Sequence, residues 1–410
     1  MQNITPNNDE KKSILDQIIT NFQAEEVARL DAVEIARNLF EQLNERERDV
    51  LSRRFGLTGD VKETLENIGN VHKLTRERIR QIETSGVKKL RSLKNLEDHI
   101  SGLRKVINQL LEEHGGIMEK EYLLNNLVNF STDGTKNKPE DISLHKNHLD
   151  FLISKLLHEH FEEVVNSSNF KDSFKLKHQA LDHLEELANE LVAKIKEIKQ
   201  IFITEDLINL STELESYKSN QEKFNPPSNL DISKILEKNS FKEDAEKINN
   251  NKVLYSILQA SKKIEQNKFG HWGIEDWREV KPKTINDKIY LILKNHGKPM
   301  HFVEITEQIN KINFDDKGAN AATVHNELIL DDKYVLVGRG LYSLKEWGYQ
   351  KGTVVDVINS ILSESAKPLS REEIIEKVLE QRLVKKATII LALMDKKSFE
   401  KVGGKYQLKK

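Results

Sequence analysis

The sequence contains no cysteine, and this absence excludes several kinds of chemistry. Disulfide bonds, thiol catalysis and cysteine-ligated zinc are all impossible, which favours a cytoplasmic protein. The sequence also lacks an uninterrupted apolar run of the about 18 residues that a membrane helix needs, so we expect no membrane contact. The first residues, MQNITPNNDEKK, have neither the basic start nor the apolar run of a secretory signal.

Motifs that carry catalysis are also missing. There is no HExxH, GxxxxGK[ST], GxGxxG or GxSxG pattern. Thirteen His residues occur, but those at 145, 148, 158 and 160 do not have the spacing of a metal-ligand set. We therefore expect no enzyme activity, no metal and no cofactor.

Charge is abundant and unevenly placed. Residues 32–97 have 14 Lys and Arg against 11 Asp and Glu, and residues 351–410 have 13 against 8. Residues 98–283 have 26 against 32, and residues 284–350 have 8 against 9. A polyanionic partner would therefore be attracted to the two ends of this stretch, and not to its middle.

One pattern recurs beyond residue 98: a helix, a short turn, two further helices and a hairpin flanked by Gly or Asn. The helical parts include 110–127, 291–309 and 360–379, and the hairpins lie at 161–177, 334–347 and 399–409. Three helices and a small hairpin form a winged helix, so the predicted fold is mainly α with small β-hairpin wings. The expected divisions are a flexible lead at 1–31, a helix-turn-helix at 32–97, winged-helix-like units at 98–178, 282–350 and 351–410, and an irregular helical unit of the same kind at 179–281.

The segment TLENIGNVHKLTRERIRQIETSGVKKLRSL, residues 64–93, predicts two helices joined by a short turn. Thr64 and Thr75 are suited to cap them, because a threonine hydroxyl accepts from the free N–H groups of a first helical turn. On the second helix Ile79, Ile82 and Leu90 recur at helical spacing and predict one buried stripe, shared with Leu93 and Gly86.

The opposite side of that helix is polar and carries Arg76, Glu77, Arg80 and Gln81. Arg pairs with guanine, Gln with adenine, and Glu accepts from cytosine, so these side chains suit a major groove. Seven basic residues against two acidic ones between 75 and 94 suit phosphate contacts. A solvated face of charged residues is the alternative explanation of the same pattern.

The run LFEQLNERERDVLSRRFGL, followed by ETLENIGNVHKLTRERIRQIETSGVKKLR, resembles region 4 of the primary sigma-70 family over about 60 residues. The resemblance implies that Arg76, Glu77 and Gln81 read bases of a −35 promoter element, with Arg80 beside them. Phosphate contacts are expected at Arg46, Arg54, Thr64, Thr75, Arg78, Lys88 and Arg91. Docking on the β flap of RNA polymerase is expected at Phe55, Leu57, Val87 and Leu90.

The sequence departs from the family at two of these positions. His72 replaces a core Phe or Leu, and Ser85 replaces a basic residue that contacts the DNA backbone. Both changes are expected to weaken DNA binding and to leave the fold intact. About 30 residues precede the resemblance, and none resembles the part that melts the −10 element, so we do not expect a complete sigma factor.

Residues 284–348 resemble the HARE-type helix-turn-helix domain of the RNA polymerase δ subunit, through KPMHFVEITEQI and ATVHNELILDDKYVLVGRGLYSLKEWG. Ile305, Ile309, Val324 and Leu328 are its expected core, and Trp347 is expected to close the wing. Its slight negative charge favours a protein partner over phosphate. In the last unit a second DNA contact or a merely soluble basic surface is expected at Lys385, Lys386, Lys396, Lys397, Lys401 and Lys405.

Three functions fit these features. The leading hypothesis is a cytoplasmic, nucleoid-associated transcription-initiation factor that binds double-stranded DNA, RNA polymerase or both. The second is an anti-sigma factor or adaptor that mimics region 4 on polymerase without reading DNA. The third is a specificity subunit of a DNA restriction or modification system.

Overall fold

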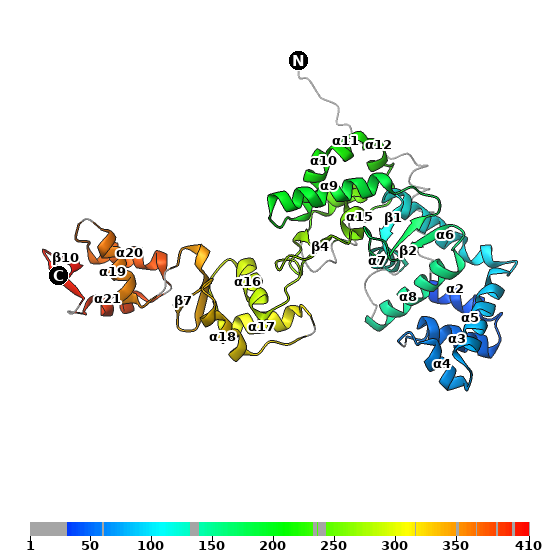
Figure 1. Cartoon of the computed structure of the whole chain (residues 1–410), viewed down its shortest axis with the longest axis horizontal. Coiled ribbons are helices and arrows are strands. Elements are labelled where there is room, and N and C mark those ends of the chain that lie inside the picture. Colours follow the sequence, from blue (N-terminus) through cyan, green and yellow to red (C-terminus); the bar gives the residue numbers. More distant parts are fainter. Residues whose placement is uncertain are drawn as a thin grey trace, which may run out of the picture. The chain divides into compact units, whose positions relative to one another are not determined.

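A computed structural model describes residues 31–59, 61–131, 139–232, 236, 243–315, 317–349, 352–365, 367–382, 384–395 and 398–409. The chain is mainly helical with short antiparallel sheets, so the predicted fold class is confirmed (Figure 1). It divides into two compact units, one up to Glu265 and one from Gln266 onward. Among the described helices, none combines the length and the apolar character needed to cross a membrane.

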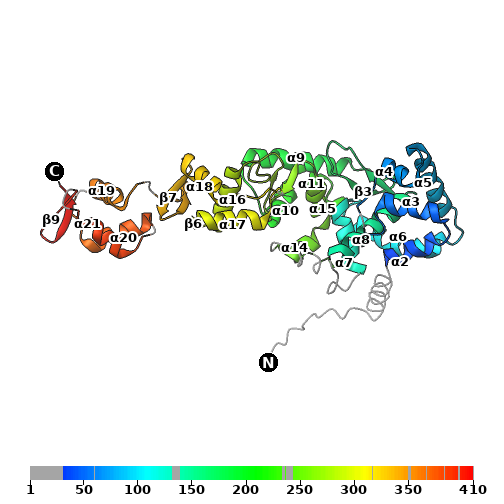
Figure 2. The same cartoon turned by 90° about the horizontal axis from the view of Figure 1, so that it is seen from below.

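From residue 31, where the described part of the first unit begins, four helices follow one another, drawn in blue in Figures 1 and 2. They are α2 (Ala32–Phe40), α3 (Glu45–Phe55), α4 (Leu65–His72) and α5 (Arg76–Arg91). Asn44 caps α3 in a reciprocal box, accepting from the Glu47 backbone N–H while the Glu47 carboxylate accepts from the Asn44 N–H. Gly56 ends the helix in the left-handed conformation at φ 67°, which a glycine adopts without a steric penalty.

A winged-helix arrangement follows directly. It consists of α6 (Leu96–Glu113), β1 (Ile117–Glu119), α7 (Lys120–Ser131), α8 (Pro139–Phe151), the π-helical turn η1 (Leu152–Leu156), β2 (Phe161–Val164) and β3 (Ser173–Leu176). The sheet order is β1-β3-β2, and all pairs are antiparallel. Phe174 on the central strand pairs with Met118 on one side and Glu163 on the other.

The rest of the first unit is helical and irregular. It contains α9 (Asp182–Ile198), α10 (Thr204–Glu213), α11 (Glu215–Ser219), α12 (Gln221–Phe224), α14 (Ala245–Asn250), α15 (Lys252–Ala260) and β4 (Ile264–Gln266). A buried ion pair ties this part to α6, because Lys252 Nζ lies 2.7 Å from Glu113 Oε2 and both side chains are almost fully buried. The backbone N–H groups of Asn229 and Leu230 also donate to Glu113, and the Ser256 hydroxyl donates to the Ile117 carbonyl.

The domain boundaries predicted between residues 97 and 98 and between residues 178 and 179 both lie inside one compact unit. The helix-turn-helix, the first winged helix and most of the irregular part share packing, so neither boundary is a break in the structure. The division between the units falls at 265/266, ahead of the predicted 281/282, and the predicted 350/351 lies within the second unit. The predicted lead, residues 1–31, lies outside the described residues except for Asp31.

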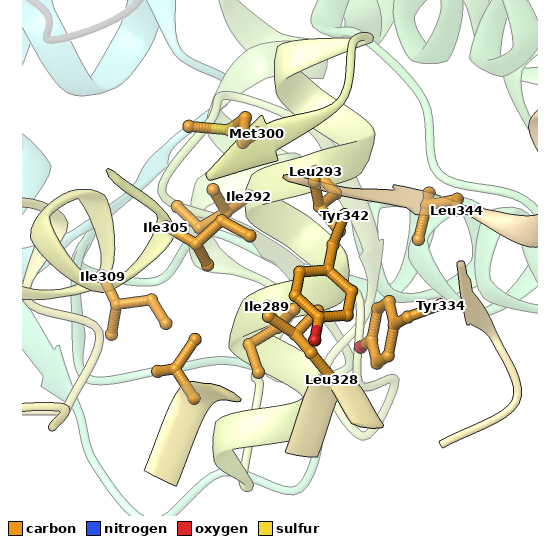
Figure 3. Close-up of a cluster of buried hydrophobic side chains, with 11 residues drawn as sticks. Ile289, Ile292, Leu293, Met300, Ile305, Ile309, Leu328, Tyr334, Tyr342 and Leu344 are labelled. Atoms are coloured by element: carbon orange, nitrogen blue, oxygen red, sulfur yellow. The ribbon is translucent and has the colours of Figure 1, made fainter. Parts of the chain in front are cut away.

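The second unit starts with β5 (Trp272–Ile274) and then repeats the winged-helix order. Its elements are α16 (Ile285–His296), β6 (Met300–His301), α17 (Phe302–Ile312), α18 (Ala321–Leu330), β7 (Tyr334–Gly338), β8 (Leu341–Leu344) and the 3-10 turn η2 (Lys345–Trp347). Figure 3 shows the core, in which Ile292 of α16, Ile305 of α17 and Tyr342 of β8 belong to one buried cluster. The predicted core residues Ile305, Ile309, Val324 and Leu328 are all buried there, and Trp347 packs against them, as predicted.

The last elements are α19 (Val354–Glu364), α20 (Arg371–Gln381), α21 (Lys386–Leu393), β9 (Phe399–Val402) and β10 (Lys405–Leu408). Tyr406 pairs with Lys401 in the hairpin and forms a bridge to Leu369 on its other side. Tyr342 occupies the same place in the preceding winged helix, between Leu336 and Met300. The two winged helices of the second unit therefore repeat the same order of elements, although the β7–β8 hairpin has a register shift between Leu336 and Gly338 that the β9–β10 hairpin lacks.

Candidate nucleic-acid interface

The turn between α4 and α5 has the close geometry of a helix-turn-helix. Lys73 ends α4 in the left-handed conformation at φ 54°, and the Leu74 N–H donates to the Gly69 carbonyl at 2.9 Å. A Cβ atom at Gly69 would lie only 2.7 Å from the Leu74 carbonyl oxygen, so the turn requires glycine at this position. Thr64 and Thr75 cap α4 and α5 through their hydroxyls, as the sequence predicts.

The inner side of α5 is anchored in a small core. Ile79 and Ile82 are buried with Val50 of α3 and Ile68 of α4. Gly86 lets α5 approach α3, because an added Cβ would meet Leu51 Cδ1 at 3.1 Å. Of the predicted stripe, Leu90 is also buried and Leu93 is half-buried. This packing fixes which side of α5 faces solvent.

The outer side carries the four predicted base-reading residues, Arg76, Glu77, Arg80 and Gln81, and all four are exposed. Arg80 donates twice to Glu77, from Nη2 at 2.7 Å and from Nε at 2.9 Å. These hydrogen bonds lower the pKa of Glu77 and raise the pKa of Arg80. The side chains project together from the first two turns of α5 and remain open to solvent.

Most of the predicted phosphate ligands surround this face. Arg46, Thr64, Thr75, Arg78 and Lys88 are exposed, and Arg78 Nη1 donates to Gln81 Oε1 at 3.1 Å. An open groove between α3 and α5 is lined by Arg46, Arg48, Arg78 and Gln81. Glu45, Glu47 and Asp49 line the same groove, so its charge is mixed.

Two predicted phosphate ligands are instead used within the chain. Arg54 Nη1 donates to the Glu63 carbonyl at 3.0 Å, and its Nε lies 3.7 Å from Glu83. Arg91 Nε donates to the Lys155 carbonyl of η1 at 2.7 Å, and burial lowers the pKa of Arg91. Both arginines hold the fold of the first unit, so neither guanidinium is fully available for DNA.

The structure does not present Phe55, Leu57, Val87 and Leu90 as an open docking surface. Leu57 and Val87 are each 7% exposed and Leu90 is fully buried. α8 and η1 pack on α3 and α5 at this side. Phe151 of α8 lies against Phe55, with ring centroids 4.9 Å apart, and Lys155 Nζ lies 5.7 Å from the Phe55 ring. The predicted flap contact would therefore require α8 and η1 to move away.

This internal contact was missed from the sequence, as was the role of His72. His72 Nε2 lies 2.7 Å from Asp49 Oδ2 of α3, so the imidazole forms a polar link where the family places an apolar side chain. Ser85 is exposed on α5. The apolar run FLISKLL after residue 150 was the available signal that α8 and η1 bury a face of their own.

Comparison with known proteins bears on the same segment. Residues 39–92 match the family described as sigma-70, region 4. The predicted region 4 domain is confirmed. An 84-residue segment is 44% identical to the RNA polymerase sigma factor RpoD of Helicobacter pylori, covering 20% of this chain and 12% of that protein. A 54-residue segment is 52% identical to the sigma factors SigA of Microcystis aeruginosa and of a Synechocystis strain, covering 13% of each chain.

The chain thus matches only about an eighth of the length of these relatives. No solved structure matches the whole chain or a part of it. The region 4 domain supports the transcription and DNA-binding classes predicted from the sequence. The resemblance of residues 284–348 to a HARE-type domain stays a prediction.

The last winged helix places its predicted DNA ligands at the surface. Lys385, Lys386, Lys401 and Lys405 are exposed, whereas Lys396 and Lys397 lie outside the described residues. Across the described ranges, no group of three or more His, Asp or Glu is arranged to hold a metal ion.

Proposed function

We propose that the region 4 domain binds double-stranded promoter DNA of the −35 type and that the protein acts in transcription initiation. The observation that carries this proposal is the outer face of α5, where Arg76, Glu77 and Gln81 are exposed together on a helix whose other side is locked in a core. A helix of this kind enters a major groove with its first turns. The relatives named as sigma factors support the same activity.

DNA is the primary ligand in this proposal, and polymerase is the second. Of the four residues expected to dock on the β flap, Leu57, Val87 and Leu90 are buried and Phe55 lies against Phe151 of α8, whereas the base-reading residues are exposed. The same cover weighs against an adaptor that uses only the flap surface. Contact with polymerase is assigned instead to residues 282–350. Helix α18 there has no Lys or Arg and exposes Ile329 and Leu330, which suits a protein surface.

The proposal is tested by substituting Arg76→Ala in the full chain. Loss of a bidentate arginine–guanine contact is expected to weaken binding to a −35-type duplex by about 1–3 kcal/mol, roughly 5- to 150-fold. Binding to a scrambled duplex of the same composition should change little. The measurement is a titration of both duplexes at one stated salt concentration.

Lys94→Ala is the matched control, because Lys94 is exposed just beyond α5 and its loss changes the net charge equally. This variant should leave the ratio between the two duplexes unchanged. If Arg76→Ala weakens both duplexes by the same factor, Arg76 contributes charge only and base reading by this residue is excluded.

A further inference from the structure

The two winged helices of the second unit have the same fold, so the charges at corresponding positions can be compared. Their third helices align from Ala322-Thr323-Val324 to Ala387-Thr388-Ile389, with Val324 and Ile389 both buried. The following leucines, Leu328 and Leu393, are buried as well. Tyr342 and Tyr406 each pair with the residue two positions ahead of the second helix, Met300 and Leu369. The residues of one winged helix can therefore be matched, position by position, with those of the other along the third helix.

The charge on these matching elements differs strongly. Residues 381–410, which contain α21 and the β9–β10 hairpin, have nine Lys and Arg against two Asp and Glu. The corresponding residues 316–345 of the preceding winged helix have four against four. Since the first repeat folds with no net charge there, the lysines of the second repeat are not required by the fold. Like charges gathered on one surface repel one another, and binding to a partner of opposite charge relieves that repulsion.

The lysines lie on two elements that share one core. Lys385 is the N-cap of α21 and Lys386 its first residue, while Lys401 and Lys405 lie on β9 and β10. Ile389 and Leu393 of α21 and Phe399 of β9 are buried in the same cluster. All four ammonium groups are exposed, and within the described ranges none of the four forms an ion pair with a carboxylate. Lys401 Nζ lies 5.6 Å from the centre of the Tyr406 ring, and Glu372 and Glu373 of α20 are near enough to attract Lys401 and Lys405. The four ammonium groups are nevertheless exposed to a partner in solution.

We propose that this last winged helix binds duplex DNA through its phosphates and does not read the sequence. Phosphates are the partner because the surface offers several separated point charges on a helix and a hairpin, which suits a charged backbone. Sequence-specific reading is not expected, because the exposed residues of α21 beside its lysine are Ala387, Thr388 and Leu391. Only Thr388 can hydrogen-bond to a base, and a single hydroxyl does not distinguish one base from another. Leu391 is 71% exposed and can contact only apolar groups such as a thymine methyl.

The experiment replaces Lys385, Lys386, Lys401 and Lys405 together by alanine in the full chain. Binding to a duplex without a −35-type sequence is measured over a range of salt concentrations. Each lysine–phosphate contact contributes about one to the slope of log K against log salt, so the slope should fall by about 3 to 4. Affinity at about 0.1 M salt should fall at least about tenfold. A second variant with arginine at the four positions should keep the slope of the unmodified chain.

The matched control replaces Lys298, Lys311, Lys317 and Lys345, four exposed lysines of the preceding winged helix, and makes the same change in net charge. It should retain most of the slope. Far-ultraviolet circular dichroism verifies that both four-alanine variants are folded. Preference for a −35-type over a scrambled duplex arises at α5, so it should persist in the Lys385/Lys386/Lys401/Lys405 variant whether or not this proposal holds.

Three results would overturn the proposal. The first is an unchanged slope in the four-alanine variant, and the second is an equal loss in the control. The third is competition by a single strand or by polyglutamate as strong as competition by duplex, because the site would then be selective for negative charge alone.

Discussion

α5 is the last helix of the region 4 domain and α8 is the last long helix of the winged helix that follows it, yet they face different surroundings. The first turns of α5 are in solvent, with Arg76 and Gln81 exposed. α8 is packed against α2 and α3, and its Phe151 lies between Phe40 and Phe55. The position of a helix in a fold therefore does not decide its role. The role of the helix depends on whether its outward side chains are polar and exposed to solvent or apolar and buried by another element.

The polar contacts of α8 have the same internal character. Asn147 Nδ2 donates to the Gly56 carbonyl at 3.0 Å, where α3 ends. The Asp150 carboxylate lies 2.8 Å from Lys62 Nζ and 2.6 Å from Lys120 Nζ. These contacts fix the first winged helix on the region 4 domain, so α8 supports α3 and thereby the helix α5 that packs on it. α8 is thus a supporting helix, whereas α5 is the helix proposed to read DNA.

The largest effect is expected from Phe151→Ala. Phe151 is 1% exposed and contacts Phe40 and Phe55, so its removal leaves a cavity at the centre of the contact. The free energy of unfolding of the first unit should fall by about 3–5 kcal/mol. Urea denaturation combined with hydrogen exchange of α3 and α8 measures the change.

Ile142→Ala on the same helix is the control, because Ile142 is exposed and its loss creates no buried cavity. It should change the unfolding free energy by less than about 0.5 kcal/mol. Equal effects of the two substitutions would show that α8 does not pack on the region 4 domain in solution.

An intermediate effect is expected from Asp150→Asn. Burial raises the pKa of Asp150, but hydrogen bonds from Lys120 and Lys62 outweigh burial and leave the pKa below its ordinary value. The neutral amide keeps the shape and removes the charge, which leaves both lysines without their shared partner. Because Lys62 is about half exposed, we expect a loss of about 1–3 kcal/mol, less than for a fully buried pair.

The pH dependence of this loss has a definite sign. A carboxyl whose pKa is lowered in the folded state stabilises the fold above its unfolded pKa, near 3.8, and this stabilisation is lost as the pH falls through the folded pKa. The difference between the original chain and Asp150→Asn should therefore be constant between pH 5 and 7 and shrink below about pH 4. Unfolding midpoints measured at several pH values provide the check, and a difference that grows toward acid pH would contradict the ion pair.

The region 4 domain could be predicted closely from the sequence because its determinants are local. Thr64 and Thr75 cap helices a few residues away, and the stripe of Ile79 and Ile82 follows from helical spacing alone. The exposed face of α5 then follows from the same periodicity.

What could not be predicted depends on contacts between distant segments. From the sequence, Phe55 is expected to be an apolar surface residue of region 4. The structure shows that it contacts Phe151, which lies 96 positions later in the sequence. The pairing of Glu113 with Lys252 is of the same kind, because nothing in either local sequence identifies the partner. The sequence therefore does not predict that residues on either side of the proposed 178/179 division are joined by this buried pair.

The smallest effect on stability, and the sharpest on recognition, is expected from Glu77→Gln on α5. The Glu77–Arg80 pair is fully exposed, so solvent screens it and the unfolding midpoint should not change.

The effect on recognition follows from the same pair. In the free protein the Glu77 carboxylate accepts hydrogen bonds from both Nη2 and Nε of Arg80. A neutral amide cannot hold the guanidinium as strongly, so Arg80 becomes available to phosphate while the acceptor for a cytosine amino group is weakened. Binding to scrambled duplexes should therefore tighten, and preference should relax at one base pair only. Titration of duplexes changed singly along the −35-type site measures this, and a uniform shift at every position would mean that Glu77 acts by charge and not by contact with a base.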